Sequence, residues 1–547
     1  MTNSDMKSID FSLNFVLFDI VLLTGYNGKR VTKRRRKIMT SAKVCIMIAI
    51  IIYLGGMLYI GYMCSRKNES TDDFYLGGRK LGPLVTAMSA EASDMSSWLL
   101  MGLPGVAYLT GISNAGWTAI GLAIGTYVNF LIVAKRLRRY SHVANNSITL
   151  PQFFKNRFHD ESRILLLISA IIIVIFFIPY TASGFAACGK LFSNLFGVSY
   201  LPAMIISAIV IVAYTTLGGF LAASTTDFVQ SIVMTLAIAV VFGFGISKVG
   251  SFDAVIENAQ SMAGYFSLTQ IYDPVTNSAS PYGLLTICSM LAWGLGYFGM
   301  PHVLLRFMAI EDAKKLKLSR RVATVWVVIS MIIAVFIGVV GNAMTKAGVI
   351  PVLEDPETII LVVADLISRH GFLAAIVAGL ILAGILAATM STADSQLLAA
   401  SSSASQNILK EVFVKDMSEK TGMVVARVTV MIIAVIAMFI ARDSDSSVFQ
   451  IVSFAWAGFG ASFGPLVLLA LFWKRSTLQG ALSGMVCGGA MIFIWKFLVR
   501  PMGGVLGIYE LLPAFLVGLA VNIIVSLLTP APSQEIQEEF DKVAAMK

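Results

Sequence analysis

Two carboxylates and several serines lie within a stretch of the chain that is otherwise apolar. Residues 89–105 read SAEASDMSSWLLMGLPG, in which small and hydroxylated residues flank Glu91 and Asp94. Hydroxyl, carbonyl and carboxylate oxygens suit a hard cation such as Na⁺. A carboxylate is costly inside a membrane, so it indicates a functional role with a cation or proton as its partner. Close helix packing remains the alternative explanation for the small residues alone.

A second polar run has the same chemistry. Residues 387–406 read LAATMSTADSQLLAASSSAS, and packing is again the alternative for Ser401–Ser403. Asp227 opens another apolar run and is expected on the same side of the membrane. The candidate oxygen ligands of the second run are Ser391, Thr392, Asp394 and Ser395. We expect these residues and the first run to lie near one another.

The composition requires that a membrane surround these runs. The 547 residues are 57% hydrophobic and 13% charged, with mean hydropathy +0.80, whereas soluble domains are about 45–50% apolar and 25% charged. The five cysteines show no CxxC pairing and the four histidines no HxxxH spacing, so neither disulfides nor a metal centre are predicted. The net charge of +10 resides in short loops, which indicates membrane orientation and excludes nucleic acid as the partner.

Apolar runs near the 20 residues needed to cross a bilayer predict an all-α integral membrane protein with about thirteen transmembrane helices. The expected spans are 41–64, 82–112, 113–135, 162–190, 200–220, 226–247, 284–306, 322–344, 372–398, 424–441, 447–472, 479–499 and 506–528. The segment 355–367 is too short and too charged to span, and it predicts an amphipathic loop helix.

The loops between these spans alternate in charge. Loops 191–199 and 264–283 contain no Lys or Arg. The loops rich in Lys and Arg are 135–139, 314–321, 410–427 and 474–475. The positive-inside rule therefore predicts a multi-pass protein of the cell (plasma) membrane, with its N-terminus outside and its C-terminus in the cytoplasm.

The chain divides into three regions. The basic cluster at 29–37 conflicts with an outside N-terminus, so residues 1–38 are expected to be an N-terminal extension that is not part of the native protein, with Met39 as the start. Residues 39–530 form the transmembrane transporter domain, and 531–547 form a cytoplasmic C-terminal tail.

Two of the expected spans are interrupted in the same way. The second contains SAEASDMSSW followed by GLPG, and the seventh contains WGLGYFGMP at 293–301. Non-helical backbone at bilayer depth lines a cavity, and matching breaks in two halves indicate the binding site of a secondary transporter. Spans two and seven are five apart, which predicts two inverted five-helix repeats with two discontinuous helices. Asp94 would lie about 18 Å deep at 1.5 Å per residue, near the depth of Trp293 and Tyr297, and a helix would place Trp293, Tyr297 and Pro301 on one face.

At these residues the chain resembles the sodium/solute symporter family, most closely its sodium/proline symporter branch. The resemblance extends from residue 72 to about 530. Its fragments are DDFYLGGRKLGPLVTAMSAEASDMSSWLLMGLPG (72–105), FFIPYTASG (176–184), GGFLAASTTDFVQ (218–230), WGLGYFGMPHVLLRFMA (293–309), ILAATMSTADSQLL (385–398) and AWAGFGASFGPLVL (455–468).

The resemblance implies a sodium site between spans two and nine. Its implied ligands are the backbone carbonyls of Ala92, Met95 and Ala388 and the hydroxyls of Ser391 and Thr392. Asp94 matches the carboxylate that proline symporters need for sodium-dependent transport. Asp227 matches a position implicated in sodium dependence, and Arg79 matches a residue tied to coupling.

The resemblance also implies a substrate pocket at the two breaks. Its implied walls are Ser96, Ser97, Tyr180, Trp293, Tyr297 and Pro301. Proline is a compact zwitterion, and freed N–H groups at a helix break suit its carboxylate. Aromatic faces suit its ring and its ammonium group through cation–π attraction.

The chain departs from the family pattern at four positions. Glu91 stands where a small residue is usual, Ser97 replaces a glycine, and Met300 replaces a polar residue. Asp394 adds a carboxylate near Asp227. We therefore hypothesise a second sodium site framed by Asp227, Ser391, Asp394 and Ser395.

The predicted function is sodium-dependent uptake of L-proline by alternating access, with Na⁺ as the coupling ion. The alternative is a sodium symporter of the same family for another small solute, such as a compatible solute, pantothenate or a sialic acid. The sequence shows no nucleophile–base pair that would predict an enzyme. The tail at 531–547 is too short for the kinase domain of a membrane sensor. The expected partners are L-proline, sodium and the lipid bilayer, with neither nucleic acid nor an obligatory protein partner.

Overall fold

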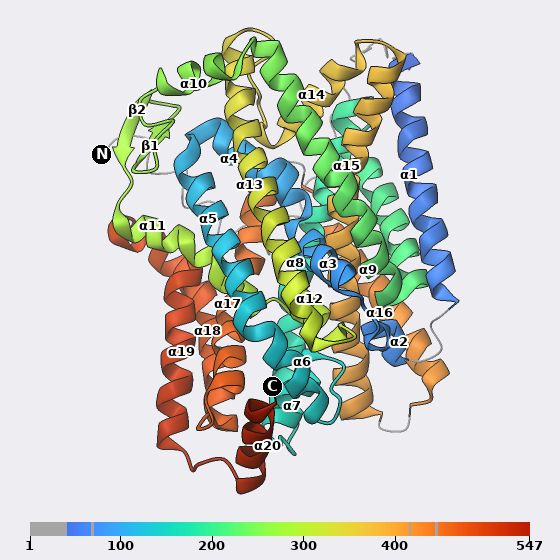
Figure 1. The fold of residues 1–547 in the computed structure, drawn as a ribbon, viewed down its shortest axis with the longest axis vertical. Coiled ribbons are helices and arrows are strands. Elements are labelled where there is room, and N and C mark those ends of the chain that lie inside the picture. The colour runs from blue at the N-terminus through green and yellow to red at the C-terminus, as the bar shows by residue number, and fades with distance from the viewer. Residues whose placement is uncertain (1–40, 67–70, 415–416, 444–446, 547) are drawn as a thin grey trace, which may run out of the picture. The chain divides into compact units, whose positions relative to one another are not determined.

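The computed structural model describes residues 41–66, 71–414, 417–443 and 447–546, which form a bundle of long helices (Figure 1). The expected N-terminal extension, residues 1–38, lies outside the described residues. The helices are α1 (Ser41–Ser65), α2 (Thr71–Leu76), α3 (Pro83–Ser97), α4 (Leu103–Thr110), α5 (Ile112–Val128), α6 (Lys135–Val143), α7 (Leu150–Arg157), α8 (Ile164–Phe196), α9 (Tyr200–Val249), α10 (Phe252–Gln260), α11 (Leu284–Leu291), α12 (Pro301–Ala309), α13 (Leu316–Lys346), α14 (Ile359–Ser368), α15 (Phe372–Ser402), α16 (Glu419–Ile440), α17 (Val448–Phe472), α18 (Leu478–Ile494), α19 (Leu511–Leu528) and α20 (Gln534–Ala545).

Short segments of other helical geometry join or extend several of these helices. Those of π type are Trp98–Gly102, Asn129–Ala134, Ser403–Phe413 and Trp495–Val499. Those of 3₁₀ type are Gly77–Arg79, Ala292–Phe298, Ala313–Lys315, Pro356–Thr358, Arg500–Met502 and Gly504–Leu506. The helix that the sequence predicts at 355–367 is present as α14 and its 3₁₀ start.

In the part of the chain that the structure describes, ten helices are long and apolar enough to cross a membrane, and the bent pair α11–α12 makes up to eleven. Two of the thirteen expected spans are not among them. The span at 82–112 is broken into shorter helices, and the span at 200–220 corresponds to the shorter apolar helix Tyr200–Ala213. These two spans therefore stay predictions.

Helix α9 joins two regions that the sequence predicts as separate spans, 200–220 and 226–247. Its backbone leaves helical geometry at Gly219, where φ is 64° and ψ is −167°. Glycine adopts a positive φ at no steric cost, so the chain turns there without losing continuity. The sequence places the gap between these two spans at 221–225. In the structure the helix instead kinks slightly earlier, at Gly219.

The expectation of an all-α fold is wrong in one place. Strands β1 (Gln270–Asp273) and β2 (Ser278–Pro281) form an antiparallel hairpin in which Gln270 pairs with Pro281 and Asp273 with Ser278. The turn is closed locally because Asp273 accepts hydrogen bonds from the backbone N–H of Val275 and the hydroxyl of Thr276. Polar turn residues between short β-prone segments favour such a hairpin.

Burial distinguishes central helices from peripheral ones. In the most apolar window of each helix, 83% of α17 and 67% of α15 is buried, against 28% of α1 and of α16. In Figure 1, α1 and α19 lie at opposite edges of the bundle. The polar run of the sequence around Ser391 is therefore on a helix enclosed by others, where a lipid-facing role is excluded.

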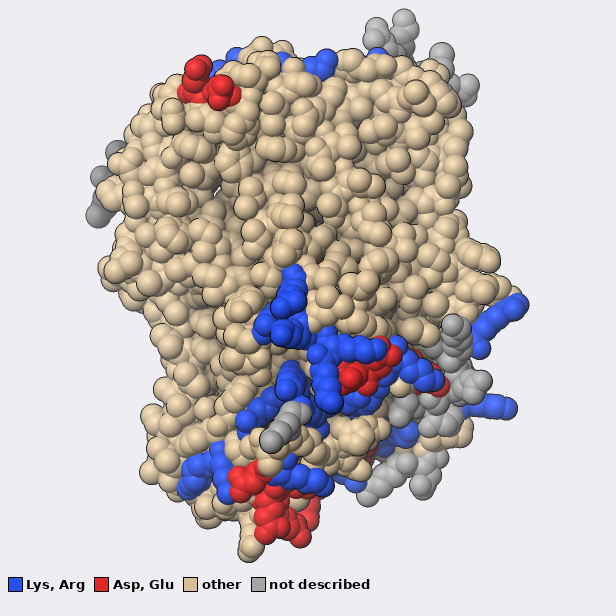
Figure 2. All heavy atoms as spheres, viewed as in Figure 1, with Lys and Arg blue, Asp and Glu red and all other residues tan. Residues whose placement is uncertain are grey.

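Charged side chains gather at one end of the bundle. Figure 2 shows most Lys and Arg side chains at the end where Figure 1 places α6, α7 and α20, and a broad band without charge above them. The C-terminal helix α20 packs at this end, with Phe540 edge-on to Tyr140 and beneath the guanidinium of Arg157. Ser533 starts α20 by accepting the N–H of Ile536, as an N-cap serine does.

Candidate functional site

The first predicted break lies between α3 and α4. Ser96 has φ 35° and ψ −174°, and the chain continues through the π-helical segment Trp98–Gly102. The N–H of Trp98 is directed at the carbonyls of Met95 and Ser96, and it also donates to the Ser96 hydroxyl at 3.0 Å. A non-glycine residue at positive φ is strained and often marks a functional site. The helix is therefore interrupted within the quoted polar run.

The second predicted break lies between α11 and α12. Its centre is the 3₁₀ segment Ala292–Phe298, and the axis bends by 44° before α12 begins at Pro301. The expectation that Trp293, Tyr297 and Pro301 recur on one α-helical face is wrong, because 3₁₀ geometry and the bend change their directions. A Cβ on Gly296 would lie 2.0 Å from the Trp456 indole nitrogen, so glycine lets α17 pack directly on this break.

The two broken segments meet. The hydroxyl of Tyr297 donates to Asp94 Oδ2 at 2.5 Å, and the rings of Trp98 and Trp293 lie 5.4 Å apart. At the end of each segment, Leu81 and Ile310 form a parallel bridge. Residues about 200 positions apart in the chain are thus held together at two levels of the bundle.

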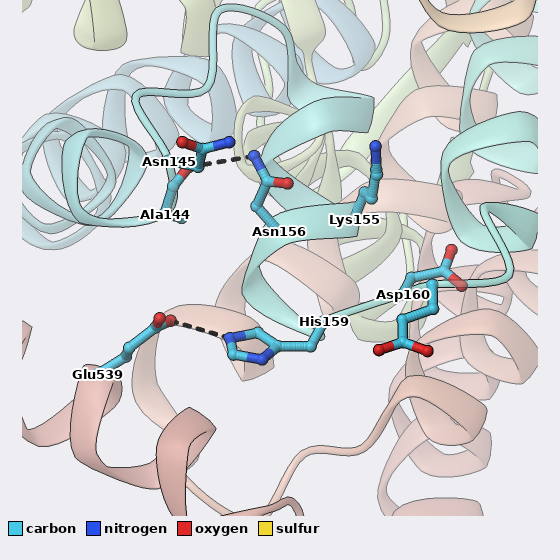
Figure 3. A pocket seen from close by; sticks show the side chains of 8 residues that line it. Ala144, Asn145, Lys155, Asn156, His159, Asp160 and Glu539 are labelled. Carbon is cyan, nitrogen blue, oxygen red and sulfur yellow. Dashed lines mark hydrogen bonds and ion pairs between the residues drawn. The ribbon is translucent and has the colours of Figure 1, made fainter. Parts of the chain in front are cut away.

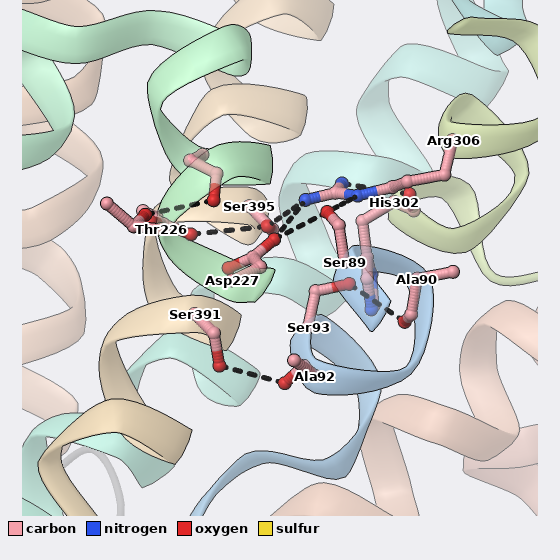
Figure 4. Close-up of polar contacts among 12 residues, drawn as sticks. Ser89, Ala90, Ala92, Ser93, Thr226, Asp227, His302, Arg306, Ser391 and Ser395 are labelled. Carbon is pink, nitrogen blue, oxygen red and sulfur yellow. Dashed lines mark hydrogen bonds and ion pairs between the residues drawn. The ribbon is translucent and has the colours of Figure 1, made fainter. Parts of the chain in front are cut away.

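Predicted sodium ligands converge between α3 and α15. The Ser391 hydroxyl lies 2.8 Å from the Ala92 carbonyl oxygen and 3.1 Å from that of Ala388, as Figure 4 shows for Ala92. The Thr392 hydroxyl lies 3.1 Å from the same Ala388 oxygen. All four residues are buried, Thr392 the least at 3% exposed. Two hydroxyls and two carbonyls are neutral oxygen ligands of the kind that a hard monovalent cation accepts.

Two further predicted ligands point elsewhere in this structure. The Met95 carbonyl faces the Trp98 N–H. The Asp94 carboxylate bonds Tyr297, and the Asp94 backbone carbonyl accepts the hydroxyl of Tyr180 at 3.3 Å. Asp94 therefore contacts two of the residues expected to line the substrate pocket, Tyr297 and Tyr180.

The predicted second cluster surrounds an arginine that sequence reasoning missed. Arg306, on α12, pairs with Asp227 at 3.2 Å and donates to Ser395 at 2.5 Å and to Ser89 at 3.0 Å (Figure 4). Ser395 in turn donates to Asp394 at 3.2 Å. All five are essentially buried. A charged residue inside an apolar run is itself a functional signal. Arg306, inside the apolar run PHVLLRFMA, carried that signal.

His302 is a second residue that sequence reasoning missed. Its ring is fully buried between those of Phe177 and Tyr180, with centroids 5.7 Å and 6.4 Å away, and its carbonyl accepts a hydrogen bond from Arg306. Neither ring nitrogen has a hydrogen-bond partner among the described residues. His302 directly follows Pro301, so it lies at the start of the helix that carries Arg306.

Aromatic rings cover the second break. The Trp293 ring stacks on Tyr509 at 5.1 Å and also contacts Trp456 and Phe449. Tyr297 meets Trp456 edge to face at 5.1 Å. Trp293 and Tyr297 are thus packed in one aromatic cluster with Trp456, Tyr509 and Phe449.

Two of the expected pocket residues are not brought into this aromatic group by any hydrogen bond or ring contact among the described residues. Ser97 is buried and its hydroxyl has no hydrogen-bond partner in that part of the chain. Pro301 occupies the first turn of α12, a position that its fixed φ favours. Both remain candidates by position at the breaks.

Arg79 lies at the charged end and binds three segments. It donates to the Met308 and Ser147 carbonyls at 2.6 Å each and to the Ser141 hydroxyl at 3.3 Å. It thereby links the turn before α3 to the end of α12 and to α6. Arg79 thus joins the turn before the first broken segment to the end of the second.

A cavity of about 280 Å³ lies where the α6–α7 turn meets α20 (Figure 3). His159 contacts Glu539 there at 3.3 Å. The cavity is lined by Ala144, Asn145, Lys155, Asn156, His159, Asp160, Glu161 and Glu539. None of these is a predicted site residue, so this cavity is separate from the two breaks.

Known proteins resemble this chain in sequence across both broken segments. The sequence model of the sodium:solute symporter family matches residues 74–488. The sodium/proline symporter of Haemophilus influenzae is 42% identical over 502 residues, which cover 91% of this chain and 97% of that protein. The high-affinity proline transporter PutP of Bacillus subtilis is 42% identical over 487 residues, covering 89% and 98%.

A solved structure gives the corresponding likeness of fold. It is described as a substrate-bound, outward-open state of a Na⁺-coupled sialic acid symporter, and it superposes with a TM-score of 0.73 at 18% identity over 90% of this chain and 99% of that one. The shared fold, the family match across both broken segments and the identity to full-length relatives lead to one conclusion: this chain belongs to the sodium:solute symporter family.

Proposed function

We propose that this protein is a secondary transporter that takes up L-proline together with Na⁺ by alternating access. The observation that carries the proposal is the contact between Tyr297 and Asp94, which joins the two broken segments beside the oxygen cluster at Ser391. The names of the full-length relatives, sodium/proline symporter and proline transporter, support proline as the substrate.

Sodium would bind at Ala92, Ala388, Ser391 and Thr392. The Ser391 hydroxyl already lies 2.8 Å from the Ala92 carbonyl oxygen, and the Thr392 hydroxyl lies 3.1 Å from that of Ala388. When sodium enters, each hydroxyl would turn its proton away and present a lone pair. Met95 and Asp94 would complete the site, which requires the Met95 carbonyl to turn from Trp98. Such binding would fasten α3 to α15.

Proline would bind at the breaks, between Ser96, Ser97 and the aromatic residues. The backbone leaves helical geometry at Ser96, and N–H groups freed at such a break would suit its carboxylate. Trp293, Tyr180 and Tyr297 supply faces for the ring and the ammonium group. Because Asp94 touches Tyr297 and Tyr180, sodium and proline would share an element, and each would raise the affinity for the other.

Asp227, Asp394 and Ser395 remain our proposed second sodium site. The positive charge of Arg306 limits how many cations this site can hold. Two carboxylates and one guanidinium leave one net negative charge, so one further monovalent cation would balance the cluster. It would bind Asp394, whose Oδ2 has no hydrogen-bond partner among the described residues. Ser391, one helical turn away, could reach the same ion.

We further propose thirteen spans with two inverted five-helix repeats, an outside N-terminus and a cytoplasmic C-terminus in the plasma membrane. The concentration of Lys and Arg at the end holding α6 and α20 supports this orientation (Figure 2). The hairpin β1–β2, expected outside, lies at the opposite end in Figure 1.

Purified protein in liposomes tests the function. An inward Na⁺ gradient should accumulate radiolabelled proline above its equilibrium level, and an equal K⁺ gradient should not. A competition panel of compatible solutes, pantothenate and sialic acid tests the alternative substrates. Failure of excess unlabelled proline to compete, with success of another solute, would reassign the substrate while leaving the mechanism intact.

A further inference from the structure

Two carboxylates of α3 are buried without a cationic partner. Glu91 is 0% exposed and Asp94 is 6% exposed, and neither forms an ion pair among the described residues. Asp227 differs, because it pairs with Arg306. A buried carboxylate that lacks a counter-charge is strongly destabilising in a membrane, so Glu91 and Asp94 are candidate cation ligands.

Polar groups of α5, of its π-helical continuation and of the second break bond these carboxylates or one another. The Thr126 hydroxyl lies 3.4 Å from Glu91 Oε2, and Asn129 donates its amide to the Tyr297 carbonyl at 3.2 Å. Tyr297 also bonds Asp94. Glu91 Oε1 and Asn129 Oδ1 are buried and have no hydrogen-bond partner among the described residues. Both are therefore free to coordinate an ion.

Apart from Asp94, which both would share, this group of oxygens differs from the sodium ligands already proposed. Thr126 and Asn129 approach α3 from the helix α5 and its π-helical continuation, whereas Ser391 approaches it from α15. The approach of α5 is close because Gly125 packs on Gly294, where a Cβ would lie 2.5 Å from that residue's backbone. The two sets of ligands thus lie on different faces of one helix.

We propose that Glu91, Asp94, Thr126 and Asn129 form an additional monovalent-cation site that takes Na⁺. The inference rests on the proposed function. One sodium at Ser391 balances one of the two carboxylates on α3, and the other still needs a positive charge. The zwitterionic substrate brings no net charge. An additional sodium beside Glu91 makes the pair Glu91 and Asp94 neutral together with the sodium at Ser391. Its ligands would be carboxylate, hydroxyl and amide oxygens.

The experiment measures sodium and proline fluxes together. Initial uptake of ²²Na⁺ and of tritiated proline is followed in liposomes at a clamped membrane potential, for the wild type, Glu91→Gln and Asp394→Asn. We expect the sodium-to-proline ratio to be about one lower in Glu91→Gln than in the wild type, because that variant loses the carboxylate that holds the additional ion. Asp394→Asn is the comparison variant, since it removes the ion proposed at Asp394, and its effect on the ratio should add to that of Glu91→Gln in the double variant.

Three results would overturn the site. These are a wild-type ratio of one, a ratio that is the same in Glu91→Gln as in the wild type, and proline-driven proton uptake in place of the additional sodium. If Glu91→Gln does not insert, a wild-type ratio of one still overturns the site, and Thr126→Val replaces Glu91→Gln. That variant should raise the sodium concentration for half-maximal uptake severalfold. Absence of any sodium-driven proline uptake in the wild type would instead reject the proposed function.

Discussion

At the scale of single residues, Asp94 holds the site together. Its side chain bonds Tyr297 from the second break, and its carbonyl accepts Tyr180 from α8. A hydrogen bond to an ionised group is worth about 1.5–3 kcal/mol. Any change at this contact should therefore alter sodium dependence and proline affinity together.

Tyr297→Phe removes only the hydroxyl that Asp94 accepts. We expect proline affinity to fall about tenfold or more, since at least 1.4 kcal/mol of interaction is lost. Equilibrium binding of labelled proline to the purified variant measures this. Tyr265→Phe is the control, because that buried hydroxyl bonds the carbonyls of Ala107 and Tyr108 outside the site. Equal effects in the two variants would contradict a specific role for Tyr297.

The double change Ser391→Ala and Thr392→Ala removes both hydroxyl ligands. The sodium concentration for half-maximal uptake should rise at least tenfold, because each lost ligand leaves a charge less well solvated. Ser401→Ala with Ser402→Ala is the matched control on the same buried helix, where the hydroxyls donate to the carbonyls of Leu398 and Ala399. Unchanged sodium dependence in the first pair would remove these residues from the site.

At the scale of elements, close packing of bare backbone holds the breaks in place. Gly296 is the sharpest case, since an added methyl would overlap the Trp456 indole. Gly296→Ala should therefore abolish or greatly reduce proline uptake. Gly243→Ala on α9 is the control because a Cβ there meets no atom within 4 Å. Uptake rates normalised to the amount of inserted protein measure both, and full activity in Gly296→Ala would contradict the packing argument.

The sequence predicts the elements better than their contacts. The polar run at Ser391, the Gly-rich break at Trp293 and their depth follow from residue type and length alone. The pairing of Arg306 with Asp227 could not be predicted, since it joins residues 79 apart on helices whose relative rotation no periodicity specifies. The one-face pattern through Tyr297 and Pro301 was wrong because it assumed an α-helix where the chain is 3₁₀ and bent.

At the scale of the whole molecule, charge predicts orientation. A thiol-reactive reagent that cannot cross membranes should label Asn277→Cys, in the β1–β2 turn, from outside intact cells. Glu538→Cys, on α20, should react only after the membrane is opened. Both are made in a variant without the five native cysteines, and the proline uptake of that variant is checked first. Labelling of Glu538→Cys in intact cells would reverse the proposed topology.

We expect Na⁺ and L-proline to bind together where the two interrupted helices meet. The most direct test is the affinity of purified protein for proline as a function of sodium, and for sodium as a function of proline. Thermodynamic linkage requires both affinities to rise by the same factor, and we expect that factor to shrink in Tyr297→Phe. Proline binding that is independent of sodium, in wild-type protein that binds both, would contradict the account.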